Sequence, residues 1–291
     1  MKRVLLDVKD GMTRVALVAD GKLVELYYET KREKSLVGNI YIGRVEKVVP
    51  NLQACFVEIG EQKNGYLYYG NARAVSDEGK NIAKPKAGDS VLVQVEKDAT
   101  KTKGMVLTQK ISFPGKFLVL LREDEEIGIS RKITYTAERE RIRNILGEIL
   151  PKTYGGIVRT NGQDRSKDEY EKEIALLLEK EKKIAGWEFK KAPTLLLEQS
   201  LPLEKATRDF YSEEIDTFIV NDKESYGVLL ETGDFNGQNQ PALLLYQDKL
   251  PIFEEFFVET QAQKALDERV WLKSGGFLVI QETEACVVVD V

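Results

Sequence analysis

Residues 38–69 read GNIYIGRVEKVVPNLQACFVEIGEQKNGYLYY, and this stretch decides the fold that the sequence predicts. Short runs of alternating apolar and polar residues are joined by turns that carry glycine and asparagine, which is typical of a small β-barrel. Side chains alternate across a strand, so Phe56 shares the polar face of its strand with Glu58. By the same rule Tyr66 and Tyr68 point together away from the core. We therefore expect Phe56, Tyr66 and Tyr68 to share one polar surface.

This aromatic surface (Phe56, Tyr66 and Tyr68) suits single-stranded nucleic acid. Bases stack on flat rings, and each stacked base contributes roughly 1–3 kcal/mol to binding. Further along the chain, Lys97, Lys101 and Lys103 add positive charge for phosphate groups. The alternative is that exposed aromatic residues only stabilise a hairpin, which is the usual explanation for a single such residue. Three aromatic residues on one face favour nucleic-acid binding.

The composition of the chain restricts its chemistry. Its 291 residues include 43 Lys plus Arg against 48 Asp plus Glu, a formal net charge of −5. Nucleic-acid-binding domains are usually basic, so any RNA affinity must come from local patches. The chain has no histidine, which removes the commonest general base and the imidazole metal ligand. Hydrolysis would therefore depend on carboxylates and a hard divalent metal ion.

The two cysteines and the hydropathy pattern predict the compartment. Cys55 and Cys286 lie far apart in apolar strand contexts, which favours buried, reduced thiols over a disulfide framework. No segment approaches the ~18 consecutive apolar residues that a transmembrane helix needs. We therefore expect a soluble, cytoplasmic protein.

Periodicity predicts the order of the elements. A hairpin is expected within residues 1–34, the barrel at about 37–112, and a helix that begins with a capping box of Ser166 and Glu169 and stops near Gly186. The many charged residues of that helix suggest a solvated face. From residue 194 onward strands and helices alternate, which is typical of α/β architecture. The remaining elements are expected at 105–112, 117–121, 136–149, 157–159, 194–198, 203–211, 217–220, 259–266, 277–281 and 286–290.

Five motifs together give the chain a resemblance to the RNase E/G family of bacterial endoribonucleases, over essentially all of its length. They are MKRVLLD with RVALVADGKLVELYYE, then NIYIGRVEKVVPNLQACFVEIG, GIVRT, SGGFLVI, and TEA followed by VVVDV. The resemblance implies an α+β multidomain fold in which an RNase H-like part is split around an S1-like OB-fold barrel. Its expected segments are 1–36 and 201–266 for the RNase H-like part, 37–112 for the barrel, 113–200 for a 5′-sensor subdomain, and 267–291 for the start of a DNase I-like nuclease subdomain.

The resemblance also assigns binding residues. The family's RNA-contacting barrel positions fall on Phe56, Tyr66 and Lys103, so resemblance and strand alternation indicate the same surface. Tyr66 replaces a phenylalanine expected there, and both rings offer a face for stacking. The end-sensing pocket for a 5′-monophosphate falls on four residues that we call the candidate phosphate pocket, namely Gly115, Val119, Arg159 and Thr160.

Elementary chemistry agrees with this pocket. Arg159 offers a planar fork that matches phosphate oxygens, Thr160 offers a hydroxyl, and a glycine lets the backbone approach closely. The alternative interpretation is that GIVRTNG only ends a strand in a polar turn. In that case Arg159 would pair with an acid such as Glu169 or Asp168.

The resemblance places Asp290 as the first of two aspartates that hold a catalytic Mg²⁺, so Asp290 is both the catalytic and the metal-binding candidate. A hard cation takes oxygen ligands and can activate water for attack on a phosphodiester. By the same resemblance the second aspartate, and an asparagine just beyond Asp290, would lie after Val291. So would the cysteine pair that shares a Zn²⁺ between subunits in the complete family protein. Gln281 stands where a family aspartate is expected, and Glu284 is retained as a supporting residue.

The sequence therefore predicts an RNase E/G-type endoribonuclease that cleaves single-stranded RNA with Mg²⁺ and prefers a 5′-monophosphate. Because CVVVDV (286–291) breaks off inside what looks like a buried strand, we expect a truncated chain that binds RNA without cutting it. The complete protein is expected to form a homo-oligomer and this chain to be monomeric. Two alternatives stay open: a non-catalytic RNA-binding or adaptor protein that has lost its nuclease half, and an OB-fold scaffold without an RNA role.

Overall fold

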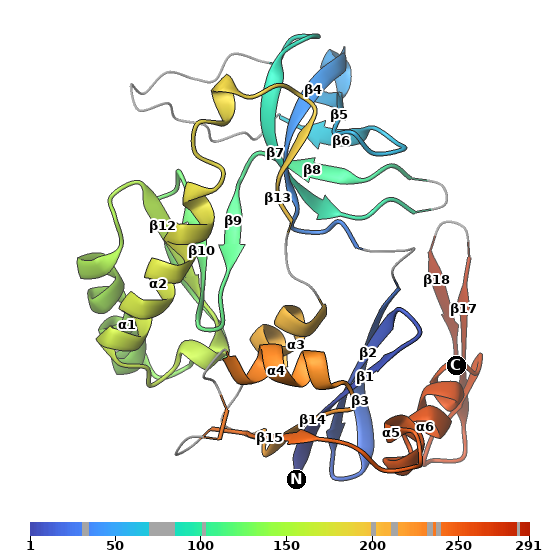
Figure 1. Ribbon diagram of the computed structural model, residues 1–291. Coiled ribbons are helices and arrows are strands. Elements are labelled where there is room, and N and C mark those ends of the chain that lie inside the picture. The colour runs from blue at the N-terminus through green and yellow to red at the C-terminus, as the bar shows by residue number, and fades with distance from the viewer. Residues whose placement is uncertain are drawn as a thin grey trace. The chain divides into compact units, whose positions relative to one another are not determined.

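The computed structural model describes residues 1–30, 35–69, 85–100, 103–198, 202–210, 215–231, 235–236, 240–283 and 286–291. The chain forms two compact units (Figure 1), which we call the sheet unit (Met1–Lys34 with Pro202–Val291) and the barrel unit (Ser35–Leu201). Both units contain helices and β-sheet. The mixed α/β class expected from the sequence is therefore confirmed.

The barrel unit begins with a closed ring of five strands. In ring order they are β4 (Ile40–Val49), β5 (Ala54–Glu58), β6 (Gly65–Tyr68), β8 (Val106–Thr108) and β7 (Ser90–Lys97). The ring closes because β7 also pairs with the first half of β4, from Ile40 to Arg44. A 3₁₀ turn, Pro50–Leu52, joins β4 to β5. Cys55, Val57 and Leu67 are among the buried side chains inside the ring. This barrel is consistent with the expected OB fold.

The strand expected at 194–198 is present as β13 (Thr194–Leu197), but it does not begin an α/β alternation as predicted. It pairs antiparallel with β4, where Thr194 lies opposite Ile42. The physical reason is the offset of the barrel strands. β5 pairs with β4 only from Arg44 onward, so this edge of β4 between Ile40 and Ile42 is open for β13.

The strand expected at 105–112 is divided between two sheets, which corrects the prediction. Its first part is β8 of the barrel, and its end starts β9 (Ser112–Pro114) of a second sheet. The buried side chain of Gln94 holds this change of direction, because its Oε1 accepts the Ser112 N–H (2.9 Å) and its Nε2 donates to the Ser112 carbonyl (2.9 Å). The second sheet has the order β11-β12-β10-β9, with β10 (Leu118–Arg122), β11 (Ile127–Ile129) and β12 (Tyr154–Val158).

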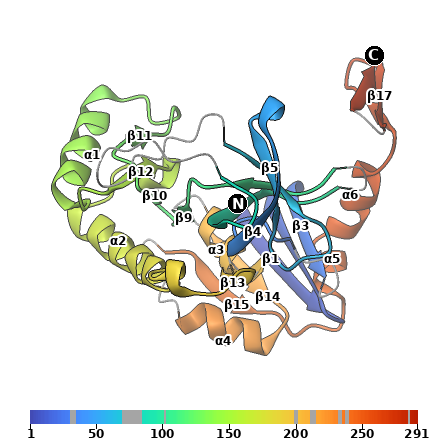
Figure 2. The same cartoon turned by 90° about the horizontal axis from the view of Figure 1, so that it is seen from above.

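Two helices lie beside this sheet in both views (Figure 1, Figure 2), α1 (Thr136–Ile149) and α2 (Lys167–Lys182). Both were expected from the sequence. The capping box of Ser166 and Glu169 is present at the start of α2, and Gly186 adopts the left-handed conformation after its end (φ 69°). Apolar side chains of both helices share one core with β10 and β12; they include Ile142, Leu146, Tyr170, Ile174 and Leu177. A 3₁₀ turn, Trp187–Phe189, follows.

The sheet unit has a five-stranded sheet that joins the two ends of the chain. Its order is β15-β14-β1-β2-β3, with β1 (Lys2–Lys9), β2 (Met12–Ala19), β3 (Lys22–Thr30), β14 (Thr217–Val220) and β15 (Ala242–Leu245). β1, β14 and β15 are parallel, whereas β1, β2 and β3 are antiparallel. The hairpin expected within residues 1–34 is β2 with β3, which are joined at Asp20 and Gly21. The strand β1 extends that hairpin through a second turn at Asp10 and Gly11, which both have positive φ.

Side chains alternate along the strands, so both faces of this sheet carry apolar residues. Helices cover both faces. Val4, Leu6 and Phe218 share one core with Phe210 of α3 (Pro202–Phe210) and Leu229 of α4 (Lys223–Glu231). The opposite face packs against α5 (Ile252–Glu255) and α6 (Val258–Ala265). Among the described residues no helix is long and apolar enough to cross a membrane.

The last residues form a three-stranded antiparallel sheet of β16 (Arg269–Trp271), β17 (Phe277–Glu282) and β18 (Val287–Asp290). The strands expected at 277–281 and 286–290 are therefore present. Their expected burial is wrong, because Cys286 and the valines of β18 are exposed, whereas Cys55 is buried. An apolar run favours a strand, but its burial depends on whether another element packs against it.

Candidate nucleic-acid interface

The aromatic surface lies on the outer face of the barrel. Phe56 of β5 lies directly opposite Tyr66 of β6 in the strand register, and their ring centroids are 6.1 Å apart in an edge-to-face arrangement. Tyr68 lies two residues further along the same strand, is exposed, and donates its hydroxyl to Gln53 Oε1 (3.3 Å). Strand alternation therefore placed the three rings correctly. Their contact with RNA stays a prediction.

Gly65 explains how β6 reaches this position. A Cβ atom at Gly65 would lie 2.3 Å from Leu107 Cδ1 in the barrel interior, so only glycine fits the close approach of β6 and β8. Lys103 belongs to the turn before β8 and is exposed. Its carbonyl accepts the Thr100 N–H (2.8 Å), and two residues later the Met105 carbonyl accepts the Tyr66 N–H (2.8 Å). The structure thus brings the Lys103 turn next to the strand of Tyr66, while Lys101 lies outside the described residues.

Sequence reasoning missed one cation beside the aromatic rings. The register of β4 and β5 shifts between Val45 and Lys47, and Lys47 then lies directly opposite Phe56. This irregularity adds Glu46 to one strand, as in a β-bulge, and turns the exposed Lys47 to the face of Phe56. Simple alternation from the core residue Val45 would have pointed Lys47 inward, so no sequence signal indicated it.

The candidate phosphate pocket is assembled where β10 and β12 pair. The Arg159 N–H donates to the Phe117 carbonyl (2.7 Å), and Arg159 Nη1 donates to the Gly115 carbonyl (3.0 Å). Thr160 follows Arg159 in the chain, and its hydroxyl lies 3.1 Å from that of Ser130. Val119 is half-buried on β10, opposite Ile157 of β12. The structure therefore connects Gly115, Arg159 and Thr160 by direct contact or chain neighbourhood, and Ser130 is an addition that the sequence did not indicate.

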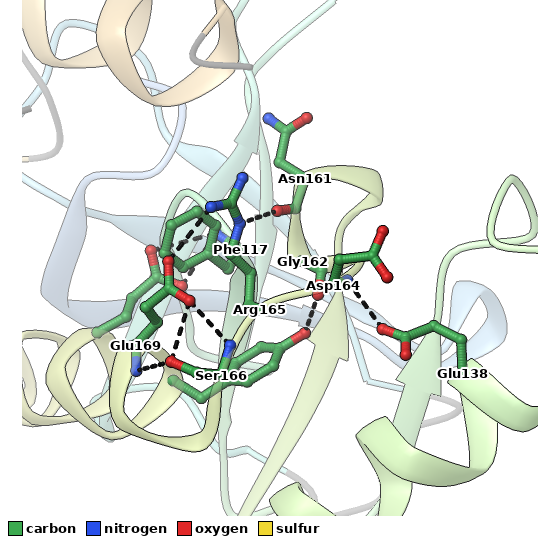
Figure 3. Close-up of polar contacts among 10 residues, drawn as sticks. Phe117, Glu138, Asn161, Gly162, Asp164, Arg165, Ser166 and Glu169 are labelled. Atoms are coloured by element: carbon green, nitrogen blue, oxygen red, sulfur yellow. Dashed lines mark hydrogen bonds and ion pairs between the residues drawn. The ribbon is translucent and has the colours of Figure 1, made fainter. Parts of the chain in front are cut away.

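Glu169, one of the acids considered as a partner for Arg159, has other partners in the structure. Glu169 accepts from Arg165 Nη1 (3.2 Å) and from the Ser166 N–H (2.8 Å), as Figure 3 shows. The first contact is an ion pair with Arg165, and the second is part of the capping box at the start of α2. Glu169 is thus engaged at the start of α2.

The loop that carries Thr160 is fixed at several points (Figure 3). Arg165 lies over the Phe117 ring (4.9 Å to its centroid) and donates its Nε to the Asn161 carbonyl (3.1 Å). The buried Tyr170 hydroxyl donates to the Gly162 carbonyl, and burial raises the pKa of this hydroxyl. Glu138 accepts the Asp164 N–H (2.9 Å). A loop held in this way presents its hydroxyl and backbone groups in one conformation, which a phosphate site requires.

Comparisons with known proteins assign the chain to a family. A sequence model described as "Ribonuclease E/G family" matches residues 112–291. Ribonuclease G of Haemophilus influenzae and Ribonuclease G of Escherichia coli K12 are each 33% identical over 302 residues, covering 99% of this chain. The chain belongs to the ribonuclease E/G family. Ribonuclease E of a Nostoc species is 30% identical over 95% of this chain. The resemblance seen in the sequence is thereby confirmed.

The chain is shorter than the relatives that it matches. The chain spans 61% of the length of the two Ribonuclease G relatives and 41% of the Ribonuclease E relative. Activities of these family members are therefore properties of longer proteins.

The metal position that the family resemblance assigns is Asp290, at the end of β18. Its Oδ1 accepts the Val291 N–H (3.0 Å), and β18 pairs with β17 so that Asp290 lies opposite Val279. Gln281 donates to Glu268 Oε2 (3.4 Å), and Glu284 lies outside the described residues. In the described parts of the chain no three acidic, cysteine or histidine side chains form a group that could hold a metal ion. These residues alone do not fit a Mg²⁺ site, and we assign no catalytic step to Asp290.

Proposed function

We propose that this chain is the RNA-binding and 5′-end-sensing portion of a single-strand-specific endoribonuclease that acts in RNA processing and decay. The single observation that carries the proposal is the pair of neighbouring rings of Phe56 and Tyr66 on the outside of a closed barrel. Such rings stack bases without regard to sequence. The flanking cations Lys47 and Lys103 supply charge for the phosphates, so a chain with a negative net charge can still bind RNA locally.

The second part of the proposal concerns the RNA 5′ end. Arg159 and Thr160 would bind a terminal monophosphate, which carries more negative charge than a 5′-hydroxyl and offers additional acceptor oxygens. Because the loop is already fixed, little of the binding free energy from the phosphate contacts is lost in ordering the chain. These contacts should therefore increase affinity. A 5′-hydroxyl RNA would bind through the barrel alone.

The subdomain assignments follow from the same proposal. The sheet unit has helices on both faces of a mixed sheet, and this supports its assignment as the RNase H-like part. Residues 37–112 would form the S1-like barrel, and residues 113–200 would form the 5′ sensor. Residues 267–291 would start a DNase I-like nuclease subdomain. Hydrolysis with Mg²⁺ needs ligands beyond Asp290, so we propose that this chain binds RNA without cleaving it.

The test is fluorescence anisotropy with one short single-stranded RNA that carries either a 5′-monophosphate or a 5′-hydroxyl. Phe56→Ala removes the ring on which one base stacks, and this stacking contributes roughly 1–3 kcal/mol to binding. Both RNAs should therefore bind about 5- to 150-fold more weakly. Arg159→Ala should abolish the preference for the monophosphate and leave the 5′-hydroxyl RNA unaffected. Matched controls are the exposed Tyr28→Ala on β3 and Arg143→Ala on α1.

Two results would contradict the proposal. Equal affinity of the unchanged chain for both RNAs would remove the sensing function, and the barrel function could still stand. Failure to bind either RNA at low salt, or a Phe56→Ala variant that binds as tightly as the Tyr28→Ala control, would leave a barrel without a nucleic-acid role.

A further inference from the structure

Glu173 is a buried carboxylate that the proposed RNA contacts do not use. It lies on α2 and is only 8% exposed. Its Oε1 accepts the N–H groups of Lys116 (2.5 Å) and Phe117 (3.1 Å), and its Oε2 accepts those of Phe117 (2.9 Å) and Leu118 (3.0 Å). Burying a carboxylate is costly unless hydrogen bonds compensate for the lost water. Here three consecutive backbone N–H groups of one turn provide that compensation.

This turn, residues 115–118, joins β9 to β10 and also receives Arg159. The Gly115 carbonyl accepts Arg159 Nη1, and the Phe117 carbonyl accepts the Arg159 N–H. Gly115 is required beside the carboxylate, since a Cβ atom there would lie 2.7 Å from Glu173 Cδ. The same short turn is therefore held by Glu173 on one side and holds Arg159 on the other.

The two sets of contacts pass through the same peptide groups. The Gly115 carbonyl and the Lys116 N–H belong to one peptide plane, so this plane donates to Glu173 and accepts from the Arg159 guanidinium. The Phe117 carbonyl and the Leu118 N–H form a second such plane, which accepts the Arg159 N–H. Hydrogen bonds in a chain polarise one another, so a negative charge at the N–H end makes each carbonyl a stronger acceptor.

A contact of this kind fits the requirements of an anion site. A carboxylate paired directly with an arginine satisfies the guanidinium and competes with phosphate for it. Glu173 instead makes its hydrogen bonds to N–H groups and reaches Arg159 through neutral carbonyl groups. Its charge can orient the guanidinium without forming that direct pair. Burial raises the pKa of Glu173 above its usual value, and the hydrogen bonds from the three backbone N–H groups limit that rise by stabilising the carboxylate.

We propose that Glu173 is a positioning residue for 5′-monophosphate recognition, which fixes Arg159 through the two peptide groups of the 115–118 turn. This inference rests on the proposed sensing role of Arg159. Glu173 should affect the preference between the two RNA 5′ ends and should not affect RNA binding by the barrel.

The test compares Glu173→Gln with Glu171→Gln, an exposed position on the same helix. The amide keeps the size of the side chain but removes its charge and one of its two accepting atoms. The affinity ratio between 5′-monophosphate and 5′-hydroxyl RNA should fall by about 2- to 13-fold in Glu173→Gln, the effect of one hydrogen bond. Affinity for the 5′-hydroxyl RNA should stay unchanged, and Glu171→Gln should behave as the unchanged chain does.

A double-variant cycle separates positioning from a general loss of structure. In an Arg159→Ala background, Glu173→Gln should have no further effect on the ratio, because the group that it positions is absent. If Glu173→Gln does not fold, Glu173→Asp is measured in the same way and should give a smaller loss of the ratio, since it keeps the charge on a shorter side chain. The ¹⁵N resonance of the Arg159 guanidinium should shift in either variant.

The outcomes distinguish this inference from the function on which it rests. If the unchanged chain shows no preference for the monophosphate, the sensing function itself fails. If the preference exists and Arg159→Ala abolishes it, but the folded Glu173 variant keeps the full ratio, the positioning role is refuted. Equal weakening of both RNAs by the Glu173 variant would also refute it, because that pattern indicates a structural role only.

Discussion

Gly115→Ala tests the geometry of the candidate phosphate pocket in the absence of RNA. The added Cβ atom would lie 2.7 Å from Glu173 Cδ, 2.8 Å from Glu173 Oε1 and 2.8 Å from the Leu118 carbonyl oxygen. Atoms at these distances must move. One neighbour is backbone and the other is a buried side chain held by the N–H groups of residues 116–118, so neither can move without losing hydrogen bonds.

The magnitude combines two effects. Forcing one extra carbon into a packed site costs typically about 1–3 kcal/mol. Displacing Glu173 leaves at least one buried N–H without its acceptor, which costs about 1–3 kcal/mol more. We therefore expect Gly115→Ala to destabilise the barrel unit by roughly 2–6 kcal/mol, a large fraction of the 5–15 kcal/mol typical of a domain.

The assay is urea unfolding followed by the fluorescence of Trp187, which packs against the core that α1 and α2 share. The chain has two tryptophans, so the measurement is made in a Trp271→Phe background in which only the barrel unit reports. Gly147→Ala is the matched control, because Gly147 lies within α1 and has no atom within 4 Å of an added Cβ. It should stabilise the unit by about 0.5–1 kcal/mol, since alanine favours helix. If the free energy of unfolding of Gly115→Ala is within about 0.5 kcal/mol of that of the unchanged chain, the turn relaxes easily and the reasoning is refuted.

Three residues can each be tested by a separate experiment, namely Lys47, Cys55 and Glu138. Lys47→Ala should weaken binding of both RNAs and reduce the slope of log affinity against log salt by about 0.7, because one phosphate contact is lost from a single strand. At pH 8 a thiol reagent should modify the exposed Cys286 quickly and spare Cys55, because burial raises the pKa of the Cys55 thiol to about 11. The hydrogen bonds from Arg141 hold the pKa of Glu138 below its usual value, so its contribution to stability is present above the unfolded-state pKa of about 4.3 and is lost as pH falls through the folded-state pKa. The difference in urea midpoint between the unchanged chain and Glu138→Gln should therefore shrink as the pH is lowered from 6 to 3.

Each of these predictions has its own control. Lys182→Ala on α2 should leave the salt slope unchanged, and an equal decrease in both lysine variants would deny Lys47 a specific role. Denaturant should expose a second reactive thiol; rapid modification of two thiols in the folded chain would show that Cys55 is accessible. Glu140→Gln, at an exposed position on α1, should give a midpoint difference that does not depend on pH in this way. A constant difference for Glu138→Gln would show that its pKa is not lowered.

Local patterns predicted the parts of the structure that depend on neighbouring residues. The alternation of β5 and β6 placed Phe56 and Tyr66 on one face, and the capping box correctly located the start of α2. Both signals arise within a few residues, where strand geometry or hydrogen bonding at a helix end dominates. The family resemblance, carried by several motifs together, predicted membership correctly over nearly the whole chain.

Features that depend on distant packing were missed. The pairing of β13 with the open edge of β4 follows from the offset between β4 and β5, which no local pattern encodes. Glu173 was included among the solvated charges of its helix. Its position three residues after Tyr170 and four before Leu177 placed it on the apolar face, so the helical period carried a signal that composition concealed. Lys47 depends on a register shift and had no such signal.

The barrel and the candidate phosphate pocket are physically joined, and this bears on how one RNA could use both. Gln94, buried in β7, donates to the Gly38 carbonyl (2.9 Å) and bonds both backbone groups of Ser112, only three residues before Gly115. Ile40 and Leu92 of the barrel also share a core with Phe113. A connection of this kind would hold the two proposed binding sites at a fixed separation, so the second contact of a bound RNA would be intramolecular and its effective concentration would depend on RNA length. Preference for a 5′-monophosphate should therefore appear above a minimum RNA length rather than for every oligonucleotide.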